Sequence, residues 1–240
     1  MTAKRSGRQS ANSAQQTRKQ ILCVAGELFV EKGFDRVSVR EIADSAGVSH
    51  GLIRHHFGSK HQIWEQVCDR VLNDVLMQIK TILSELDPKL PANERYFSLI
   101  SRFLATQLCD PRPMRLMVDA VRDNEMLFNY FQDAPADIEA LFDSELRAVQ
   151  AQGYLEGMKV KEMKWLICMF TDAPATLAPL LVDVYDTSLD KARVQHWMLA
   201  CQLLANPLGI SNDKIPRPAT LEEVALPWSR CTPDDLCDET

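Results

Sequence analysis

Hydrophobic residues recur every three or four positions over most of this 240-residue chain, the spacing that places them on one face of an α-helix. In the first such stretch Ile21, Ala25 and Phe29 form an apolar stripe, and Gly33 then predicts the end of the helix. Similar patterns predict helices over residues 92–109, 112–124, 135–152, 161–185 and 188–205. No convincing strand alternation, internal repeat or glycine-rich phosphate loop occurs. The pattern therefore predicts an all-α protein.

Two serines mark further helix starts. Ser38 followed by Glu41, and Ser59 followed by Gln62, have the spacing at which a serine and an acidic or amide side chain cap each other's backbone. They predict one helix that opens at Ser38 and a longer one that opens at Ser59. A short helical segment from Ser49 lies between them.

The residues between the two caps fit a helix-turn-helix. Ala43 stands where two helices would touch, Gly47 where a sharp turn favours a positive φ, and Ile53 where an apolar residue would anchor the second helix. Ser49 caps that second helix. Such a short helix fits the major groove of DNA. The alternative is a helical hairpin packed inside an all-α protein.

The side chains of the second helix favour DNA over the hairpin. Its expected exposed residues are His50, Gly51, Arg54 and His55. An interior element would not carry Arg54, His55, His56 and Lys60 so close together, and the cap serines and helix N-termini offer hydrogen-bond donors to phosphate. We therefore predict that this end of the chain binds DNA.

Charge is distributed unevenly along the chain. The net charge is -6, yet residues 1–60 contain 10 Lys and Arg against 5 Asp and Glu, and the remaining residues contain 17 against 28. This asymmetry indicates a polyanion-binding end on an acidic body. A chance fluctuation of surface charge is the alternative, and the helix-turn-helix pattern argues against it.

The segment 21–64, "ILCVAGELFVEKGFDRVSVREIADSAGVSHGLIRHHFGSKHQIW", resembles the signature of the TetR family of bacterial transcriptional regulators. The similarity lies in the "A-x-x-L-F-x-x-x-G-F" helix, the "S-V-R-E-I-A-x-x-A-G-V-S" turn and the closing "H-F-G-S-K". The resemblance implies an N-terminal three-helix helix-turn-helix DNA-binding domain and a larger helical ligand-binding and dimerisation domain. It also implies a ligand-responsive regulator, usually a repressor, that binds a palindromic double-stranded DNA operator as a homodimer.

The resemblance also assigns roles to single residues. Those expected at the DNA backbone are Ser38, Arg40, Ser49, His56 and Lys60, and those expected to face bases are His50, Gly51 and His55. Arg54 departs from the family, which usually has tyrosine there. Its longer charged fork could reach either a phosphate or a guanine.

Composition divides the chain into four parts. We expect a disordered basic arm over 1–15, the DNA-binding domain over 16–60, the ligand-binding and dimerisation domain over 61–205, and a Pro-rich acidic tail over 206–240. Part of the tail is expected to pack through Leu221, Val224, Leu226 and Trp228.

The larger domain is rich in aromatic and methionine residues that could line a cavity between helices. The candidates are Phe97, Phe103, Met114, Met117, Phe128, Phe131, Trp165 and Phe170. An ordinary core is the alternative for each of them. Together they favour a small apolar or aromatic effector. By the resemblance, the helices over 161–185 and 188–205 would pair with their copies in a dimer, unless they complete a monomeric core.

Other classes of function have weaker support. His50, His55, His56 and His61 lack a common helix face and nearby acidic or cysteine ligands, so neither a metal site nor a cofactor is predicted. No catalytic constellation is visible, so we predict a protein that is not an enzyme. The alternatives are an accessory or nucleoid-type DNA-binding protein without an effector and, last, an all-helical enzyme.

The chain has no apolar run near the roughly 18 residues of a membrane span, and we expect a cytoplasmic protein without a membrane partner. Most of the seven cysteines are expected to be small apolar residues with reduced thiols. Cys231 and Cys237 lie in the polar tail and are the expected exposed thiols, with a redox role left open.

Overall fold

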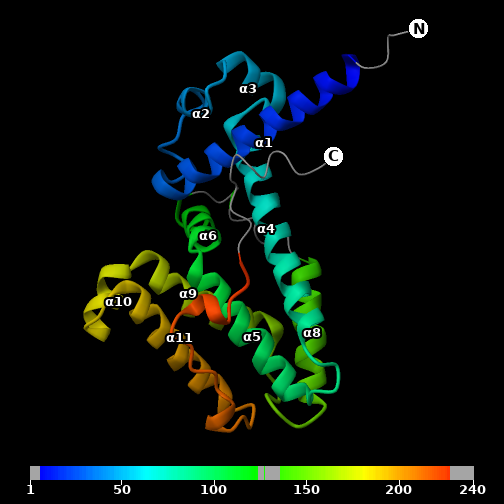
Figure 1. The fold of residues 1–240 in the computed structure, drawn as a ribbon, viewed down its shortest axis with the longest axis vertical. Helices are drawn as coiled ribbons and strands as arrows, with labels where there is room; N and C mark the ends of the chain where they lie inside the picture. Colours follow the sequence, from blue (N-terminus) through cyan, green and yellow to red (C-terminus); the bar gives the residue numbers. More distant parts are fainter. Residues whose placement is uncertain (1–5, 124–126, 128–135, 228–240) are drawn as a thin grey trace. The chain divides into compact units, whose positions relative to one another are not determined.

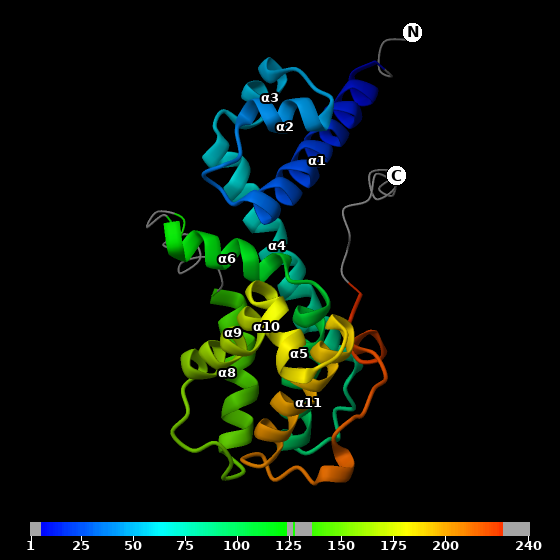
Figure 2. The same ribbon diagram turned by 90° about the vertical axis from the view of Figure 1, so that its left-hand side faces the viewer.

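The computed structural model describes residues 6–123, 127 and 136–227, with side chains over 14–121, 127 and 136–227 (Figure 1, Figure 2). Its helices are α1 (Ser6–Lys32), α2 (Val39–Ala46), α3 (His50–Phe57), α4 (Lys60–Glu85), α5 (Ala92–Cys109), α6 (Arg112–Asp123), α8 (Ala136–Gln150), α9 (Val160–Thr176), α10 (Ala178–Tyr185) and α11 (Leu189–Ala205). Two 3₁₀ turns follow, η1 (Asn212–Lys214) and η2 (Leu221–Glu223). The described residues contain no strand, and the predicted all-α class is confirmed.

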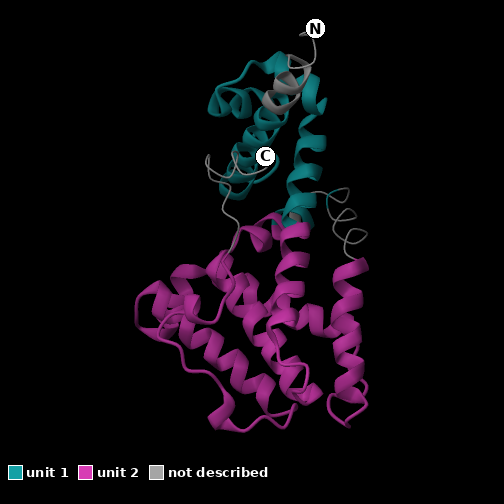
Figure 3. Cartoon of the chain, turned by 45° about the vertical axis from the view of Figure 1, so that its right-hand side comes forward, with its two compact units in different colours: residues 1–71, 119–130, 229–240 teal, residues 72–118, 131–228 magenta. Residues whose placement is uncertain are grey.

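The described residues form two compact units, coloured separately in Figure 3. The N-terminal unit runs to Val71 and takes in α6 from Asp119, and the C-terminal unit starts at Leu72. The predicted domain boundary at residue 60 therefore falls too early. The reason is that the first turns of α4 bury Trp64 and Val67 in the N-terminal unit.

Helix α1 begins earlier than predicted. It starts at Ser6, so the structure has helix over most of the segment that we expected to be a disordered basic arm at 1–15. Helix propagation costs little once a helix is nucleated. The buried Ile21, Ala25 and Phe29 fix the later turns of α1, and the Ala, Ser and Gln residues before them extend it.

The C-terminal unit is built around α5, which packs against α8, α9, α11 and η2. Its buried core includes Phe97, Ile100, Phe103, Leu104, Phe142, Leu146, Met163, Ile167, Trp197 and Cys201. The rings of Phe103 and Phe142 meet edge to face with centroids 5.5 Å apart. These residues recur at helical spacing in the sequence, because each helix turns one face to α5.

The helix predicted over 161–185 is two helices, α9 and α10, bent by 92° at Leu177. Pro174 lacks the N–H that would reach the carbonyl of Phe170, and Pro179 lacks the one that would reach Ala175. Side chains of other helices occupy both carbonyls. Nε2 of His196 donates to the Phe170 oxygen at 2.8 Å, and Nε of Arg115 donates to the Ala175 oxygen at 3.2 Å. We call this bend the elbow.

The part of the tail that the structure describes belongs to the C-terminal unit. Its buried residues are Leu208, Ile210, Ile215 and Leu221, and Val224 and Leu226 are partly buried against the same core. Asn93 donates to the Leu208 carbonyl at 2.9 Å, and the Leu226 N–H donates to Thr106 Oγ1 at 3.0 Å. The predicted packing is confirmed at Leu221, Val224 and Leu226, whereas Trp228 lies outside the described residues.

Two further predictions concern cysteines and membranes. Cys68 and Cys201 are buried as expected, and burial raises the pKa of the Cys201 thiol to about 12. Cys231 and Cys237 lie outside the described residues. Across the described ranges no single helix is long and apolar enough to cross a membrane, and α9 with α10 passes that test only as a bent pair.

Candidate nucleic-acid interface

The turn between α2 and α3 has the geometry of a helix-turn-helix. Gly47 adopts φ 66 and ψ 29, a left-handed conformation that glycine adopts without strain, and its N–H closes the end of α2 on Ala43 and Asp44. Ala43 and Ala46 are buried, so the two helices approach closely. The small residue and the glycine predicted for this turn are confirmed.

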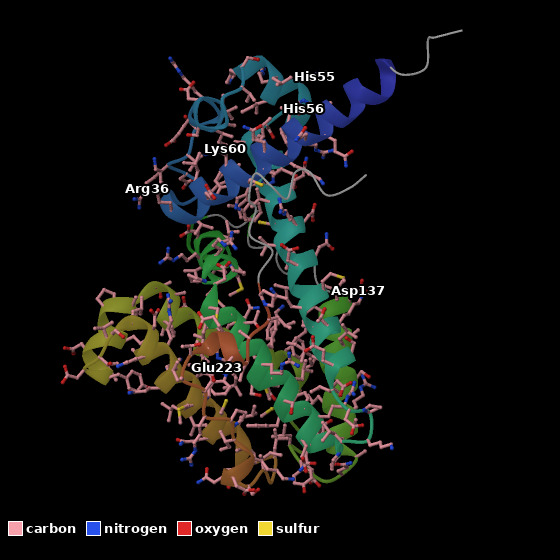
Figure 4. The ribbon with its side chains drawn as sticks, viewed as in Figure 1. Arg36, His55, His56, Lys60, Asp137 and Glu223 are labelled. Carbon is pink, nitrogen blue, oxygen red and sulfur yellow. The ribbon has the colours of Figure 1, made fainter. Side chains whose placement is uncertain are left out.

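Helix α3 has one buried edge and one exposed face. Ile53 and Phe57 are buried in the N-terminal unit, whereas His50, Gly51, Arg54 and His55 are exposed. His56 is half-buried, with its ring 5.5 Å from that of His55 (Figure 4). The face predicted for base contacts is therefore open.

Both predicted cap serines act as caps. Ser38 Oγ accepts from the Glu41 N–H at 3.1 Å, and Ser49 Oγ accepts from the Leu52 N–H at 3.2 Å. Each hydroxyl keeps its own proton, which remains a donor for a phosphate oxygen. Ser59 and Gln62 form the predicted reciprocal cap of α4, each receiving the other's backbone N–H.

Arginines on this side of the unit are exposed. The side chain of Arg40 is 87% exposed and only 4.0 Å from Asp44, a surface pair that contributes little. Arg54 is exposed on α3, and Arg36 is exposed just before the Ser38 cap (Figure 4). Arg36 was not among the predicted site residues, although its place beside a predicted cap was the available signal.

Lys60 is directed differently from its predicted role at the DNA backbone. Its Nζ donates to the carbonyl of Phe34 at 2.9 Å, lies 3.5 Å from that of Asp35, and is 4.1 Å from the centre of the Phe34 ring. Burial lowers the pKa of Lys60, and the charge of Asp35 acts in the opposite direction. The Lys60 ammonium therefore bonds to backbone carbonyls of its own domain.

Two other cations are also engaged within the unit. Lys32 lies 2.6 Å from Glu41, and their hydrogen bond and charges raise the pKa of Lys32 and lower that of Glu41. Arg18 donates to Gln66 Oε1 at 2.7 Å and lies over the Phe57 ring at 5.6 Å. Arg18 thus holds the end of α3 near α4, a role that the sequence did not reveal because it joins distant residues.

His61 lies apart from the other three histidines of the cluster. Its ring stacks on Trp64 at 6.3 Å and meets Phe34 edge-on, and its Nε2 is 3.4 Å from Glu65 Oε1. No group of three or more His, Cys, Asp or Glu able to hold a metal ion occurs in the part of the chain with described side chains.

The predicted ligand-lining residues divide into four groups. Phe97, Phe103 and Met114 are buried, Met117 and Phe170 are half-buried, and Phe128 and Phe131 lie outside the described residues. Trp165 is 66% exposed. The prediction that Trp165 lines a cavity in the core is therefore wrong, because the face of α9 that meets α5 carries Met163 and Ile167 instead.

Trp165 is one of several large apolar side chains exposed on α9, α10 and α11 and at the elbow. The others are Leu166, Met169, Leu177, Leu180, Val184, Leu199 and Leu203. We call this set the apolar face. Lone exposed apolar residues are normal, but a group of this size on helices that pack together is a candidate interaction surface.

A short exposed polar helix, held by a partner helix through a left-handed glycine turn, defines a helix-turn-helix DNA-binding domain. Residues 21–67 match the sequence model of bacterial regulatory proteins of the tetR family. Over these residues the N-terminal domain is similar to the DNA-binding domain of that family.

Related proteins share this domain. The HTH-type transcriptional repressor KstR2 of Rhodococcus jostii is 34% identical over 67 residues, which are 28% of this chain and 33% of that protein. The HTH-type transcriptional regulator TtgR of Pseudomonas putida is 32% identical over 83 residues, 34% of this chain and 40% of that protein. The chain thus matches less than half the length of these relatives, which are transcription regulators.

Solved structures share the fold over more of the chain. The SmeT–triclosan complex has a TM-score of 0.60 at 20% identity and covers 88% of this chain and 99% of its own. The regulator FadR from Bacillus subtilis, solved with stearoyl-CoA, has a TM-score of 0.57 at 19% identity and covers 79% and 95%. At these identities the likeness concerns the fold.

Proposed function

We propose that this protein is a ligand-responsive transcriptional regulator that binds a palindromic DNA operator as a homodimer. The observation that carries the proposal is α3, whose exposed face consists of His50, Gly51, Arg54 and His55 while its opposite edge is buried. Side chains of this kind donate to and accept from base edges in the major groove. Arg36, Arg40 and the two cap serines would contact phosphates on either side.

The apolar face supports the homodimer. Its residues come from α9, α10, α11 and the elbow, and apolar side chains such as Trp165 and Val184, each 66% exposed, gain stability when a second copy covers them. A two-fold dimer would place two α3 helices in successive major grooves about 34–36 Å apart. A palindromic operator follows from that symmetry.

Two observations support a small apolar or aromatic effector. The C-terminal unit buries Phe97, Phe103 and Phe142 in one core cluster, and two proteins of similar fold were solved with triclosan and stearoyl-CoA. The effector would shift the population toward a spacing of the two α3 helices that no longer fits the operator. Repression is the proposed sign of regulation, as in the relative named a repressor.

The first test is selection from a random DNA pool with the full-length protein at physiological salt. We expect enrichment of an inverted repeat whose half-sites are centred about one helical turn apart. Binding without an enriched motif, and with a steep loss as salt rises, would contradict the regulator and indicate accessory DNA binding.

The second test adds candidate apolar compounds to the protein–operator complex. An effector should weaken operator binding by the same factor by which the operator weakens effector binding. A compound that binds tightly and leaves operator affinity unchanged would contradict the proposed coupling for that compound.

A further inference from the structure

The turn that joins α1 to α2 determines where the residues proposed to contact phosphate lie. Gly33, with φ 79, ends α1, and the Val37 N–H then donates to the Phe34 carbonyl at 3.3 Å across the turn. The side chain of Val37 is buried, which holds the last residue before Ser38 in place. Arg36 is part of this turn, and Ser38 and Arg40 follow it directly. A displacement of the turn would therefore move all three.

Backbone carbonyls of this turn lack helical partners. The Phe34 and Asp35 oxygens follow the end of α1, where the helix dipole concentrates partial negative charge. The ammonium of Lys60, from the first turn of α4, faces both oxygens, at 2.9 Å and 3.5 Å. A cation at this position is a second donor to the Phe34 carbonyl, beside the Val37 N–H, and a donor to the Asp35 carbonyl, and it is attracted to the end of the helix.

Aromatic side chains hold the ammonium in place. Nζ lies 4.1 Å from the centre of the Phe34 ring, a cation–π distance. The Phe34 ring is packed edge-on against Trp64 and His61, with centroids 6.2 Å and 6.3 Å away. The Lys60 side chain is thus partly covered at the start of α4, and this burial lowers its pKa.

We propose that Lys60 is a positioning residue, which supports operator binding by anchoring the α1–α2 turn to α4 and makes no essential phosphate contact. This inference rests on the proposed operator binding. It reverses the role that the sequence predicted for Lys60, and it assigns the phosphate contacts of this side of the domain to Arg36, Ser38 and Arg40. Loss of the Lys60 ammonium would displace these residues without removing any charge that faces DNA.

The salt dependence of binding separates the two roles. Each phosphate contact that a substitution removes lowers the slope of log affinity against log salt by about one. The experiment measures operator affinity of the wild type, Lys60→Met and Arg40→Met between roughly 50 and 300 mM salt, well below each melting temperature. Arg40→Met is the matched control, because its side chain is exposed and is proposed to contact phosphate.

We expect Lys60→Met to bind roughly tenfold more weakly at every salt concentration, the loss typical of one hydrogen bond to a charged group. Its slope should equal that of the wild type and its melting temperature should be lower. Arg40→Met should lose about one unit of slope per subunit and keep its melting temperature. If Lys60→Met fails to fold, Lys60→Gln removes the same charge, leaves an amide that still donates, and is measured in its place.

Two results would overturn the proposal. A slope that falls in Lys60→Met as it does in Arg40→Met would show a phosphate contact, and unchanged affinity and melting temperature would show that Lys60 anchors nothing. If the wild type selects no DNA sequence, the proposed function fails separately. The melting temperatures of Lys60→Met and Arg40→Met then still decide whether Lys60 anchors the turn.

Discussion

Helices α3 and α10 differ in what they expose, although each is eight residues long. Helices this short are unstable alone, so each is held by a buried residue, Ile53 in α3 and Leu181 in α10. The exposed residues of α3 are polar and include Arg54. Those of α10 are mostly apolar and include Leu180 and Val184, with Asp183 as the exposed charge. A similar scaffold thus presents hydrogen-bonding groups in one unit and apolar area in the other.

This difference indicates two kinds of partner. Polar groups on a rigid helix lose little free energy when they leave water, because the polar edges of bases replace their hydrogen bonds to water. Leucine and valine side chains lower the free energy only when another apolar surface covers them. DNA is the proposed partner of α3, and a second copy of the chain is the proposed partner of α10. Four experiments test this comparison, from the largest expected effect to the smallest.

Charge placed on the apolar face should separate the dimer. We expect Trp165→Glu with Val184→Glu to raise the dissociation constant of the dimer by about 100-fold or more, since large central apolar residues often contribute about 2 kcal/mol or more each. Sedimentation velocity at micromolar concentration measures the shift from dimer to monomer. Operator affinity should fall with it, because one subunit offers one half-site reader.

The matched control is Met77→Glu. Met77 is 58% exposed but lies on α4, and it is not one of the residues of the apolar face. This variant should remain dimeric. Equal dissociation of both proteins, or of neither, would contradict the assignment of the apolar face to the dimer.

Arg54→Ala should weaken operator binding by about 1–3 kcal/mol if its fork contacts a guanine, and it should relax the preference at one base pair per half-site. The fold should be unaffected, since the side chain is exposed. Binding-site selection with the variant measures the change. A uniform loss over all sequences would place Arg54 on phosphate instead.

His196→Phe should destabilise the elbow by about 1–2 kcal/mol, because it leaves the Phe170 carbonyl without its donor. In a Pro174→Ala background the helix regains the N–H at position 174, so the same substitution should cost little there. Urea unfolding of the four proteins in this cycle gives the coupling. The same loss in both backgrounds would show that His196 does not replace the bond missing at Pro174.

Gly51→Ala should have the smallest effect of the four, and it should change operator affinity and stability in opposite directions or leave stability unchanged. An added Cβ at Gly51 would meet only Ser49 Oγ, at 4.0 Å, so the fold has room for it. Stability should stay the same or rise by up to about 1 kcal/mol, since alanine favours the helix. Operator affinity should nevertheless fall, because the methyl group would face the bases. Thermal unfolding and binding isotherms measure the two changes, and lower stability of the variant would contradict this account.

Much of the N-terminal unit was predictable from the sequence because its determinants are local. The Ser38 and Ser49 caps join residues three positions apart, and the turn at Gly47 depends on one residue's φ. The exposure of Arg54 follows from its place about 100° around the helix from Ile53, off the buried edge of α3. The roles of these side chains toward DNA remain predictions.

The sequence by itself determined the all-α class, the helix-turn-helix and the start of most helices, because caps, glycine stops and helical periodicity act over a few residues. Only the tertiary structure decided which lysine and arginine side chains bond to other groups of the protein, which apolar residues are exposed and where the long helix bends. Lys60 bonds to a turn 25 residues away in the sequence, and Trp165 lies on the face of α9 that α5 leaves uncovered. The carbonyls that the two prolines leave unpaired accept hydrogen bonds from side chains of α6 and α11. Each of these outcomes depends on which distant segment lies beside a residue, and packing in three dimensions sets that.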